Sequence, residues 1–301
     1  MLSSHSSPNL RQLHHQELGH SMGDKLFFKL ALWWGFAVAP CLWWMWRGSP
    51  VPYGRHHSGA HDTPGTPSLP YVHIVLPTRV AWFLMECPPL LLLPPIFALG
   101  RDASSPVPRL LALLFLMHYG HRSLVYPLRM RPSETRNFPI IVLLSGFLFN
   151  MYNTYIQARS LSHFTFYPLT WFSSSRFVLG SFLFVSGMMI NIWADSVLMS
   201  LRKSASTKSA TLMNSQENFF KSYVIPRGGL FELVTCPNYF GEILEWLGWA
   251  IATWSFAGLV FLALTVCNLS PRAVAHHRWY IRNFANYPTN RRALIPFAFD
   301  M

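Results

Sequence analysis

The stretch Cys236–Trp254 reads CPNYFGEILEWLGWAIATW, and it decides how the rest of the chain is interpreted. Its residues are mostly apolar or aromatic, and a second apolar run follows over 256–275. Glu242 and Glu245 interrupt the stretch three residues apart, so in a helix they share a face. A charged side chain near the middle of a bilayer costs roughly 2.5–3.5 kcal/mol on insertion scales. The stretch therefore predicts a membrane helix whose two carboxyl groups find polar partners inside a bundle.

Apolar runs of spanning length recur along the chain. Of its 301 residues, 51% are hydrophobic and only 12% are charged, whereas a soluble domain has about twice that charged fraction. A helix needs about 20 residues to cross a bilayer. Runs of this kind lie at 26–46, 71–99, 106–126, 138–158, 176–200, 237–254 and 256–275. The last two could form one bent hairpin. We therefore predict an all-α, polytopic membrane bundle of about seven transmembrane helices.

The basic residues predict the orientation of this bundle. The net charge is +12, and most of the 24 Lys and Arg residues fall in the loops and C-terminal tail that seven spans would place on one side. The positive-inside rule puts that side, with the C-terminus, in the cytosol. Nucleic-acid binding is a poor explanation for the charge, because the basic residues lie in short loops beside the membrane rather than on one soluble face.

The remaining segments show no pattern of a second domain. Residues 1–24 form a polar tail that we expect to be disordered. Residues 47–70 are a loop rich in Pro, Gly and His, and 203–222 are a Ser/Thr-rich insertion that we expect to be a mobile cytosolic loop. No cleaved signal peptide is evident. The four cysteines lack C-x-x-C spacing, which argues against a disulfide framework or a zinc site. We expect one membrane-embedded domain over 25–301.

Four of the twelve acidic residues lie inside predicted spans: Glu86, Asp195, Glu242 and Glu245. Ionisable groups at such positions are functional candidates by default. Glu86 precedes the Pro88-Pro89 pair, which must break or kink its helix. Its carboxyl group could simply bond the backbone that the prolines free. Alternatively, desolvation keeps it neutral, so that it donates a hydrogen bond to a ligand.

Two further segments place polar groups at helical spacing. HYGHR gathers His118, Tyr119 and Arg122 near the end of a span. Snorkelling Arg and interfacial Tyr are common there, but an Arg fork also suits a phosphate. NIWADSVLMSLR puts Asn191 and Asp195 on one helical face, with Arg202 seven residues later near the same face. These residues either join neighbouring helices or form a ribose clamp with an Arg for a phosphate.

The tail PRAVAHHRWYIRNFANYPTNRRALIPF alternates Arg, His and aromatic residues. Such a pattern suits stacking on a nucleotide and pairing with its phosphates. A metal site is disfavoured, because the adjacent His residues have no third ligand at usable spacing. No G-x-G-x-x-G follows a strand, so helices would have to hold any dinucleotide.

Together, NYFGEILEWLGWAIATWS, GGLFE, HYGHR, NIWAD with LRK, and the tail closely resemble the steroid 5α-reductases, or 3-oxo-5α-steroid 4-dehydrogenases, which include plant brassinosteroid and animal androgen enzymes. The resemblance covers about residues 80–300. It implies a seven-helix bundle in the endoplasmic reticulum membrane with NADPH in a cytosol-facing cavity. It also implies a 3-oxo-Δ4 steroid from the bilayer as substrate, hydride transfer to C5 and protonation at C4.

The resemblance also implies roles for single residues. Glu86 and Tyr119 match the family positions that hold the C3 carbonyl oxygen of the steroid. Glu245 is expected to be a structural partner within the bundle. The positions that match the family's cofactor-binding residues are Arg122, Asn191, Asp195, Arg202, Tyr223, Asn238, Glu242, Arg272, His276 and Tyr280.

Other functions on the same sequence remain open. A reductase of the same fold could act on a polyprenol or an enoyl thioester, and a membrane methyltransferase would use S-adenosylmethionine. A transporter or lipid-binding protein would catalyse nothing. Thermal stabilisation of the purified protein by NADPH would separate the reductases from a transporter.

Overall fold

The computed structural model describes residues 24–40, 43, 75–130, 138–209 and 223–296, with only the backbone described over 202–209. Nearly all of this part of the chain is helical, and the strands are two residues long. After a first helix at 24–40, the elements are β1 (Val75–Leu76), α2 (Thr78–Glu86), α3 (Pro88–Ala98), α4 (Pro106–Gly120), η2 (His121–Val125), α5 (Tyr126–Arg129), β2 (Phe138–Pro139), α6 (Ile140–Arg159), η4 (Ser160–Phe164), η5 (Leu169–Ser173), α7 (Ser175–Ser209), η6 (Gly229–Glu232), α9 (Pro237–Thr253) and α10 (Phe256–Asn283).

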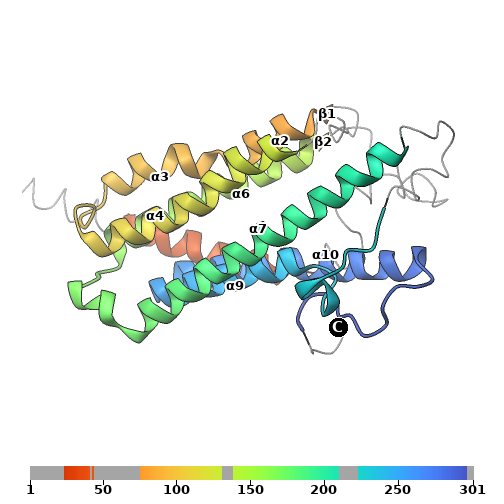
Figure 1. Cartoon of the computed structure of the whole chain (residues 1–301). Coiled ribbons are helices and arrows are strands. Elements are labelled where there is room, and N and C mark those ends of the chain that lie inside the picture. Colours follow the sequence, from red (N-terminus) through yellow and green to blue (C-terminus); the bar gives the residue numbers. More distant parts are fainter. Residues whose placement is uncertain (1–23, 41–42, 44–74, 131–137, 210–222, 297–301) are drawn as a thin grey trace, which may run out of the picture.

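The helices pack lengthwise as a bundle. In the view of Figure 1, α7 crosses the bundle diagonally, with α2, α3, α4 and α6 above it and α9 and α10 below. β1 and β2 pair antiparallel where α2 and α6 begin. The long helices are predominantly apolar, as a bilayer requires of a spanning segment, and their polar residues lie inside the bundle.

Four helices in the described part of the chain are long and apolar enough to span a membrane: Thr78–Ala98, Ile140–Phe164, Ser175–Leu201 and Phe256–Asn283. They confirm the predicted polytopic membrane bundle. The other predicted runs coincide with the helix at 24–40, with α4 and its continuation, and with α9. The protein is therefore a multi-pass, all-α membrane protein.

The structure bears on two of the local expectations. The last two predicted apolar runs form two helices, α9 and α10, which are joined at Trp254, a residue with a left-handed backbone of φ 43°. Helix α7 continues to Ser209, so its backbone extends over the first seven residues of the segment predicted to be a mobile loop at 203–222, and the mobility of that segment stays a prediction. The rest of that loop, the tail up to residue 23 and the 47–70 loop lie outside the described residues.

Two proline effects shape the helices that carry the candidate site. Helix α2 ends before Pro88 and α3 begins at it, because proline lacks the N–H that would bond the preceding turn but fits the first turn of a helix. Pro127 lacks the N–H group that would bond one turn back, and the five residues of η2 before it form a π-helical turn. Such π-turns are frequent at functional sites. Here the turn buries both Arg122 and Ser123.

Helices α7 and α9 touch along a line of glycines. Gly180 faces Gly248, and Gly187 faces Gly241 and the backbone of Glu245. A Cβ atom at either α7 glycine would collide with the α9 backbone. Because these glycines have no Cβ atom, the two helix backbones contact each other directly, as is common at small residues in membrane bundles. Polar side chains on both helices are thereby brought within hydrogen-bonding distance.

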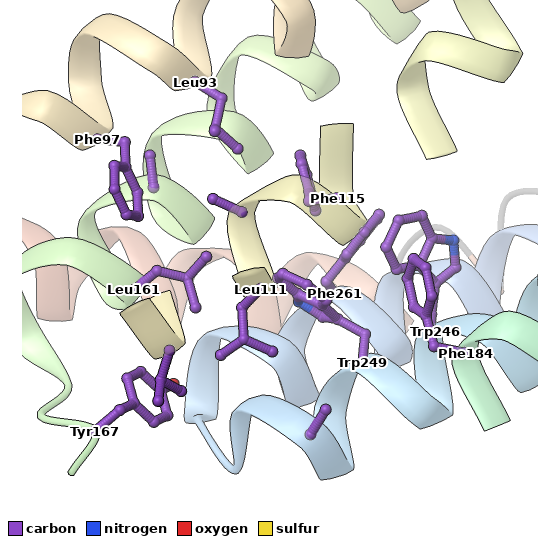
Figure 2. Close-up of a cluster of buried hydrophobic side chains, with 14 of the residues drawn as sticks. Leu93, Phe97, Leu111, Phe115, Leu161, Tyr167, Phe184, Trp246, Trp249 and Phe261 are labelled. Carbon is purple, nitrogen blue, oxygen red and sulfur yellow. The ribbon is translucent and has the colours of Figure 1, made fainter. Parts of the chain in front are cut away.

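An aromatic core lies beside this seam. Figure 2 shows Phe115, Phe184, Trp246, Trp249 and Phe261 gathered from α4, α7, α9 and α10. The rings of Trp246 and Phe261 are 4.2 Å apart. This packing fixes α4 against α9, which matters because both helices carry site residues.

Candidate functional site

A chain of hydrogen bonds joins three helices at Asn150. The Tyr119 hydroxyl on α4 donates to Asn150 Oδ1 over 3.1 Å, and Asn150 Nδ2 on α6 donates to Glu86 Oε2 over 3.2 Å. Asn150 Nδ2 also lies 2.8 Å from the carbonyl oxygen of Met85. Tyr119 and Asn150 are buried. One amide therefore sets the positions of the two residues expected at the substrate carbonyl.

The backbone at the proline break has its own partners. Pro88 and Pro89 lack the N–H groups that would bond the carbonyl oxygens of Leu84 and Met85. These oxygens accept from Cys87 Sγ over 3.4 Å and from Asn150 Nδ2 over 2.8 Å, and the carbonyl oxygen of Glu86 accepts from Ser123 Oγ over 2.6 Å. The carboxyl group of Glu86 is therefore not needed to satisfy these carbonyls, and it accepts from Asn150 instead. The structural alternative, in which the carboxyl group bonds the freed backbone, is therefore not required, and the ligand-binding role of Glu86 stays a prediction.

Arg122 connects this group to α7. Its guanidinium lies 3.5 Å from Asp195 and 3.9 Å from Glu86. The rings of Trp82 and Tyr126 flank it at 4.9 and 5.0 Å. The carboxylate of Asp195 and the two rings offset the desolvation of this buried Arg.

A second polar group lies on the seam between α7 and α9. Asn191 Nδ2 donates to the carbonyl of Asn238 over 2.9 Å and to Glu242 Oε2 over 3.3 Å. Asn238 Nδ2 donates to Asp195 Oδ1 over 3.0 Å. Four residues predicted from separate motifs are therefore one network, and Asp195 connects it to Arg122.

Glu245 is paired within the bundle. His118 Nδ1 lies 2.8 Å from Glu245 Oε1, and both side chains are buried. This contact gives Glu245 the structural partner that the sequence predicted. His118, the residue before Tyr119, is that partner.

The remaining described candidates lie around the second half of α10. His276 Nε2 is 3.3 Å from the Tyr239 hydroxyl, and the Arg272 guanidinium lies 5.9 Å from the same ring. Tyr280 stacks on Tyr287 at 5.3 Å. Tyr223 meets Trp279 edge-on at 5.1 Å. Tyr239 follows Asn238, so this aromatic group adjoins the α7–α9 network.

The segment after α10 folds back onto the entry to α9. Arg292 forms an isolated parallel bridge with Val234, and the Thr235 N–H donates to the carbonyl of Arg292 over 2.8 Å. Thr235 Oγ1 contacts both His277 Nδ1, at 2.6 Å, and the Tyr287 hydroxyl, at 2.7 Å. Burial raises the pKa of the Tyr287 hydroxyl above its usual 10.0.

A cluster of charged residues around Glu232 lies at the same end of α9. Glu232 accepts from the Gly228 N–H over 2.7 Å and pairs with Arg227 at 3.2 Å and Arg291 at 3.4 Å. The Gly228 hydrogen bond, with help from both Arg residues, holds the pKa of Glu232 below its usual 4.5. Gly228 has φ 89°, a conformation that favours glycine.

Asn150 and the packing partners of Arg122 are candidate functional residues that the sequence motifs do not predict. Asn150 stands in an apolar run, and a polar side chain there is itself a signal. Nothing local in the sequence indicates that Trp82 and Tyr126 would flank Arg122. Arg202 lies on α7 as predicted, and the structure describes only its backbone.

Comparison with known proteins identifies the family of the chain. The sequence model described as 3-oxo-5-alpha-steroid 4-dehydrogenase matches residues 136–299. The chain belongs to this family. Its relatives include "Steroid 5-alpha-reductase DET2" of Solanum lycopersicum, 43% identical over 82% of this chain and 88% of the relative. The protein of the same name from Arabidopsis thaliana is 42% identical over 92% and 99%.

An animal member is nearly as similar. "3-oxo-5-alpha-steroid 4-dehydrogenase 1" of Homo sapiens is 41% identical over 82% of this chain and 86% of its own. The family resemblance predicted from the sequence motifs is therefore confirmed. Most of the residues described above fall within the family match at 136–299, whereas Glu86, Tyr119 and Arg122 precede it and are covered by the matches to the full-length relatives.

Proposed function

We propose that the protein reduces the 4,5 double bond of 3-oxo-Δ4 steroids with NADPH as the hydride donor. The observation that carries this proposal is the chain from Tyr119 through Asn150 to Glu86. Its relatives are named steroid 5-alpha-reductases, which supports the substrate class.

The substrate half of the proposal rests on the charge that develops during reduction. Hydride addition at C5 of an enone moves negative charge onto the C3 oxygen, and a proton is then taken up at C4. Donors already aimed at that oxygen are worth about 10²–10³ in rate each. The Tyr119 hydroxyl is one such donor. Glu86, when protonated, would donate from Oε1, because Oε2 already accepts from Asn150.

Asn150 keeps these two donors in place. Its oxygen accepts from Tyr119 and its nitrogen donates to Glu86, so it orients both groups at once. A neutral amide does this without adding a charge near the developing oxyanion. Preorganised donors need no rearrangement during the reaction, which is the source of their effect.

The cofactor half rests on the polar groups of α7, α9 and α10, which suit NADPH. Acidic and amide groups at Asp195 and Asn238 match sugar hydroxyls, and Arg272 brings positive charge for a phosphate. The buried Arg291 has two nitrogens, Nε and Nη1, with no hydrogen-bond partner among the described residues. Donors left free in this way suit binding of an anion such as a phosphate. Bound NADPH would supply the hydride. The residues that would hold it are Arg122, Asn191, Asp195, Arg202, Tyr223, Asn238, Glu242, Arg272, His276 and Tyr280.

We also propose that the protein resides in the endoplasmic reticulum membrane with its C-terminus in the cytosol. The excess of Lys and Arg on the predicted cytosolic side supports this orientation. Glycosylation acceptor sites added at either terminus test it. Modification of a C-terminal site would contradict the proposal.

The reaction is tested in membranes that carry the protein. NADPH and a panel of 3-oxo-Δ4 steroids are added, and 5α-reduced products are measured by mass spectrometry. Membranes with the tomato relative serve as the assay control, and membranes with Tyr119→Phe serve as the negative control. Product from the wild type and little from the variant supports the proposal. No product from any steroid, with the tomato control active, overturns it.

A further inference from the structure

The most buried ionisable contact in the described chain is not accounted for by substrate or cofactor binding. His118 Nδ1 and Glu245 Oε1 are 2.8 Å apart, and their side chains are 5% and 1% exposed. The ring of Trp246 lies 4.5 Å from that of His118. The two residues are 127 positions apart in the sequence and join α4 to α9.

Such a pair is a poor way to stabilise a fold. Removing two polar ionisable groups from water costs several kcal/mol each, and replacing buried ion pairs by apolar residues is often neutral or stabilising. The second oxygen of this carboxyl group, Glu245 Oε2, is buried with no hydrogen-bond partner among the described residues. A pair so incompletely satisfied is better explained by a requirement for geometry.

The sequence neighbours of the pair indicate which geometry is held. His118 immediately precedes Tyr119, whose hydroxyl belongs to the substrate side of the site. Glu245 is nearly one turn beyond Glu242, which belongs to the α7–α9 network on the cofactor side. The pair therefore joins α4, which carries Tyr119 on the substrate side, to α9, which carries Glu242 on the cofactor side. Each member of the pair lies within one helical turn of that site residue.

We propose that His118 and Glu245 are positioning residues that hold α4 and α9 in a fixed relative placement, so that the steroid double bond and the hydride donor are aligned. The inference rests on the proposed function. Neither residue needs to touch either ligand. A displacement of about 1 Å between reacting groups can cost about 10²-fold in rate.

The inference predicts that breaking the pair lowers the hydride-transfer rate and spares affinity. The central variant replaces both residues by apolar ones, His118→Phe with Glu245→Leu. We expect a folded protein whose unfolding temperature is equal to or above that of the wild type. Its Kd for NADPH stays unchanged, and its single-turnover reduction rate falls by about 10²-fold. Because chemistry becomes limiting, deuterium at the transferred position of NADPH should slow turnover more than in the wild type.

Conservative variants provide the rescue. Asn at position 118 places its amide nitrogen near the position of His118 Nδ1, and Gln at position 245 retains an acceptor oxygen. His118→Asn and Glu245→Gln should therefore recover most of the rate lost in His118→Phe and Glu245→Leu. The matched control is Gln157→Leu, which removes a different buried hydrogen bond to α9, from Trp249 Nε1 at 2.9 Å. Its reduction rate should stay close to that of the wild type.

Several outcomes would overturn the inference. A wild-type single-turnover rate in the apolar double variant would show that the pair positions nothing. If that variant does not fold, the comparison of Glu245→Gln with Glu245→Leu decides: equal rates contradict positioning, and a rate kept only by Gln supports it. Failure of the proposed function would look different, because the wild type itself would then form no product.

Discussion

The Tyr119 hydroxyl donates a hydrogen bond of 3.1 Å to Asn150 Oδ1. The partner residues lie on α4 and α6, and the amide nitrogen of the same Asn150 donates to Glu86 at the end of α2. A side chain that is not expected to react therefore holds both expected carbonyl donors.

Tyr119→Phe removes one hydroxyl and leaves the ring packed against Phe115, 4.8 Å away. We predict that turnover of a 3-oxo-Δ4 steroid falls by about 10²-fold or more, because one donor to the developing oxyanion is lost. Glu86→Gln keeps a donor and should retain more activity than Glu86→Ala. Steady-state kinetics in membranes measure both effects, and NADPH binding should be nearly unchanged.

The double variant of Tyr119 and Glu86 tests whether the two groups serve one oxygen. Its loss in transition-state free energy should be smaller than the sum of the single losses, because groups that act as a unit are not additive. Fully additive losses would assign the two residues to different atoms. Wild-type turnover by Tyr119→Phe would remove the carbonyl assignment altogether.

Asn150→Leu should lower turnover although Asn150 is not expected to contact the steroid. Without the amide, the Tyr119 hydroxyl and the Glu86 carboxyl lose their shared partner, and we expect a loss of about 10-fold or more from the lost preorganisation. The control is Thr154→Val one turn further along α6. Within the described part of the chain, Thr154 Oγ1 bonds only its own helix, at the carbonyl of Asn150 over 2.6 Å. Similar kinetics for the two variants would argue that Asn150 merely fills space.

Arg202→Ala should discriminate between NADPH and NADH. Arg202 follows Asn191 and Asp195 along α7, at the end that we expect to face the cytosol. An Arg there suits the 2′-phosphate, which NADPH carries and NADH lacks. Lys203 is the second candidate for this contact. We predict that kcat/KM falls with NADPH and changes little with NADH. Equal losses with the two cofactors would contradict this role.

Gly187→Ala should destabilise the bundle. A Cβ atom at Gly187 would meet the backbone of Glu245 and Gly241, so α7 and α9 must separate. Overpacking of this kind costs about 1–3 kcal/mol. Gly120→Ala is the control, because its Cβ would have nothing within 4 Å. In detergent, the unfolding temperature should fall for Gly187→Ala. For Gly120→Ala it should stay unchanged or rise, because alanine favours the helix more than glycine does. The reverse order would refute the close crossing.

Glu232 should contribute stability that depends on pH. The Gly228 N–H, followed by Arg227 and Arg291, lowers the pKa of Glu232 from 4.5. A carboxyl group whose pKa is lower in the folded protein stabilises the fold above its unfolded pKa and loses that effect as the pH falls through the folded value. The unfolding temperature of the wild type should therefore exceed that of Glu232→Gln at pH 6. The difference should shrink below pH 4.5. A difference that stays constant with pH would contradict the prediction.

Much of this protein follows from its sequence. Unbroken apolar length placed the helices, because a bilayer admits only segments that satisfy their own backbone. The carboxyl groups inside those runs, Glu86, Asp195, Glu242 and Glu245, marked the places where polar partners must exist. The ordered motifs were sufficient to predict the family.

The choice of partners depended on the tertiary structure. Sequence spacing predicts which residues share a helix face, as it did for Asn191 and Asp195, because helical geometry is local. It does not predict that Asn150 joins Tyr119 to Glu86 or that His118 meets Glu245, 127 residues away. Those contacts arise where glycines and aromatic side chains let particular helices approach. Each buried polar group must then bond to whatever that packing brings within reach.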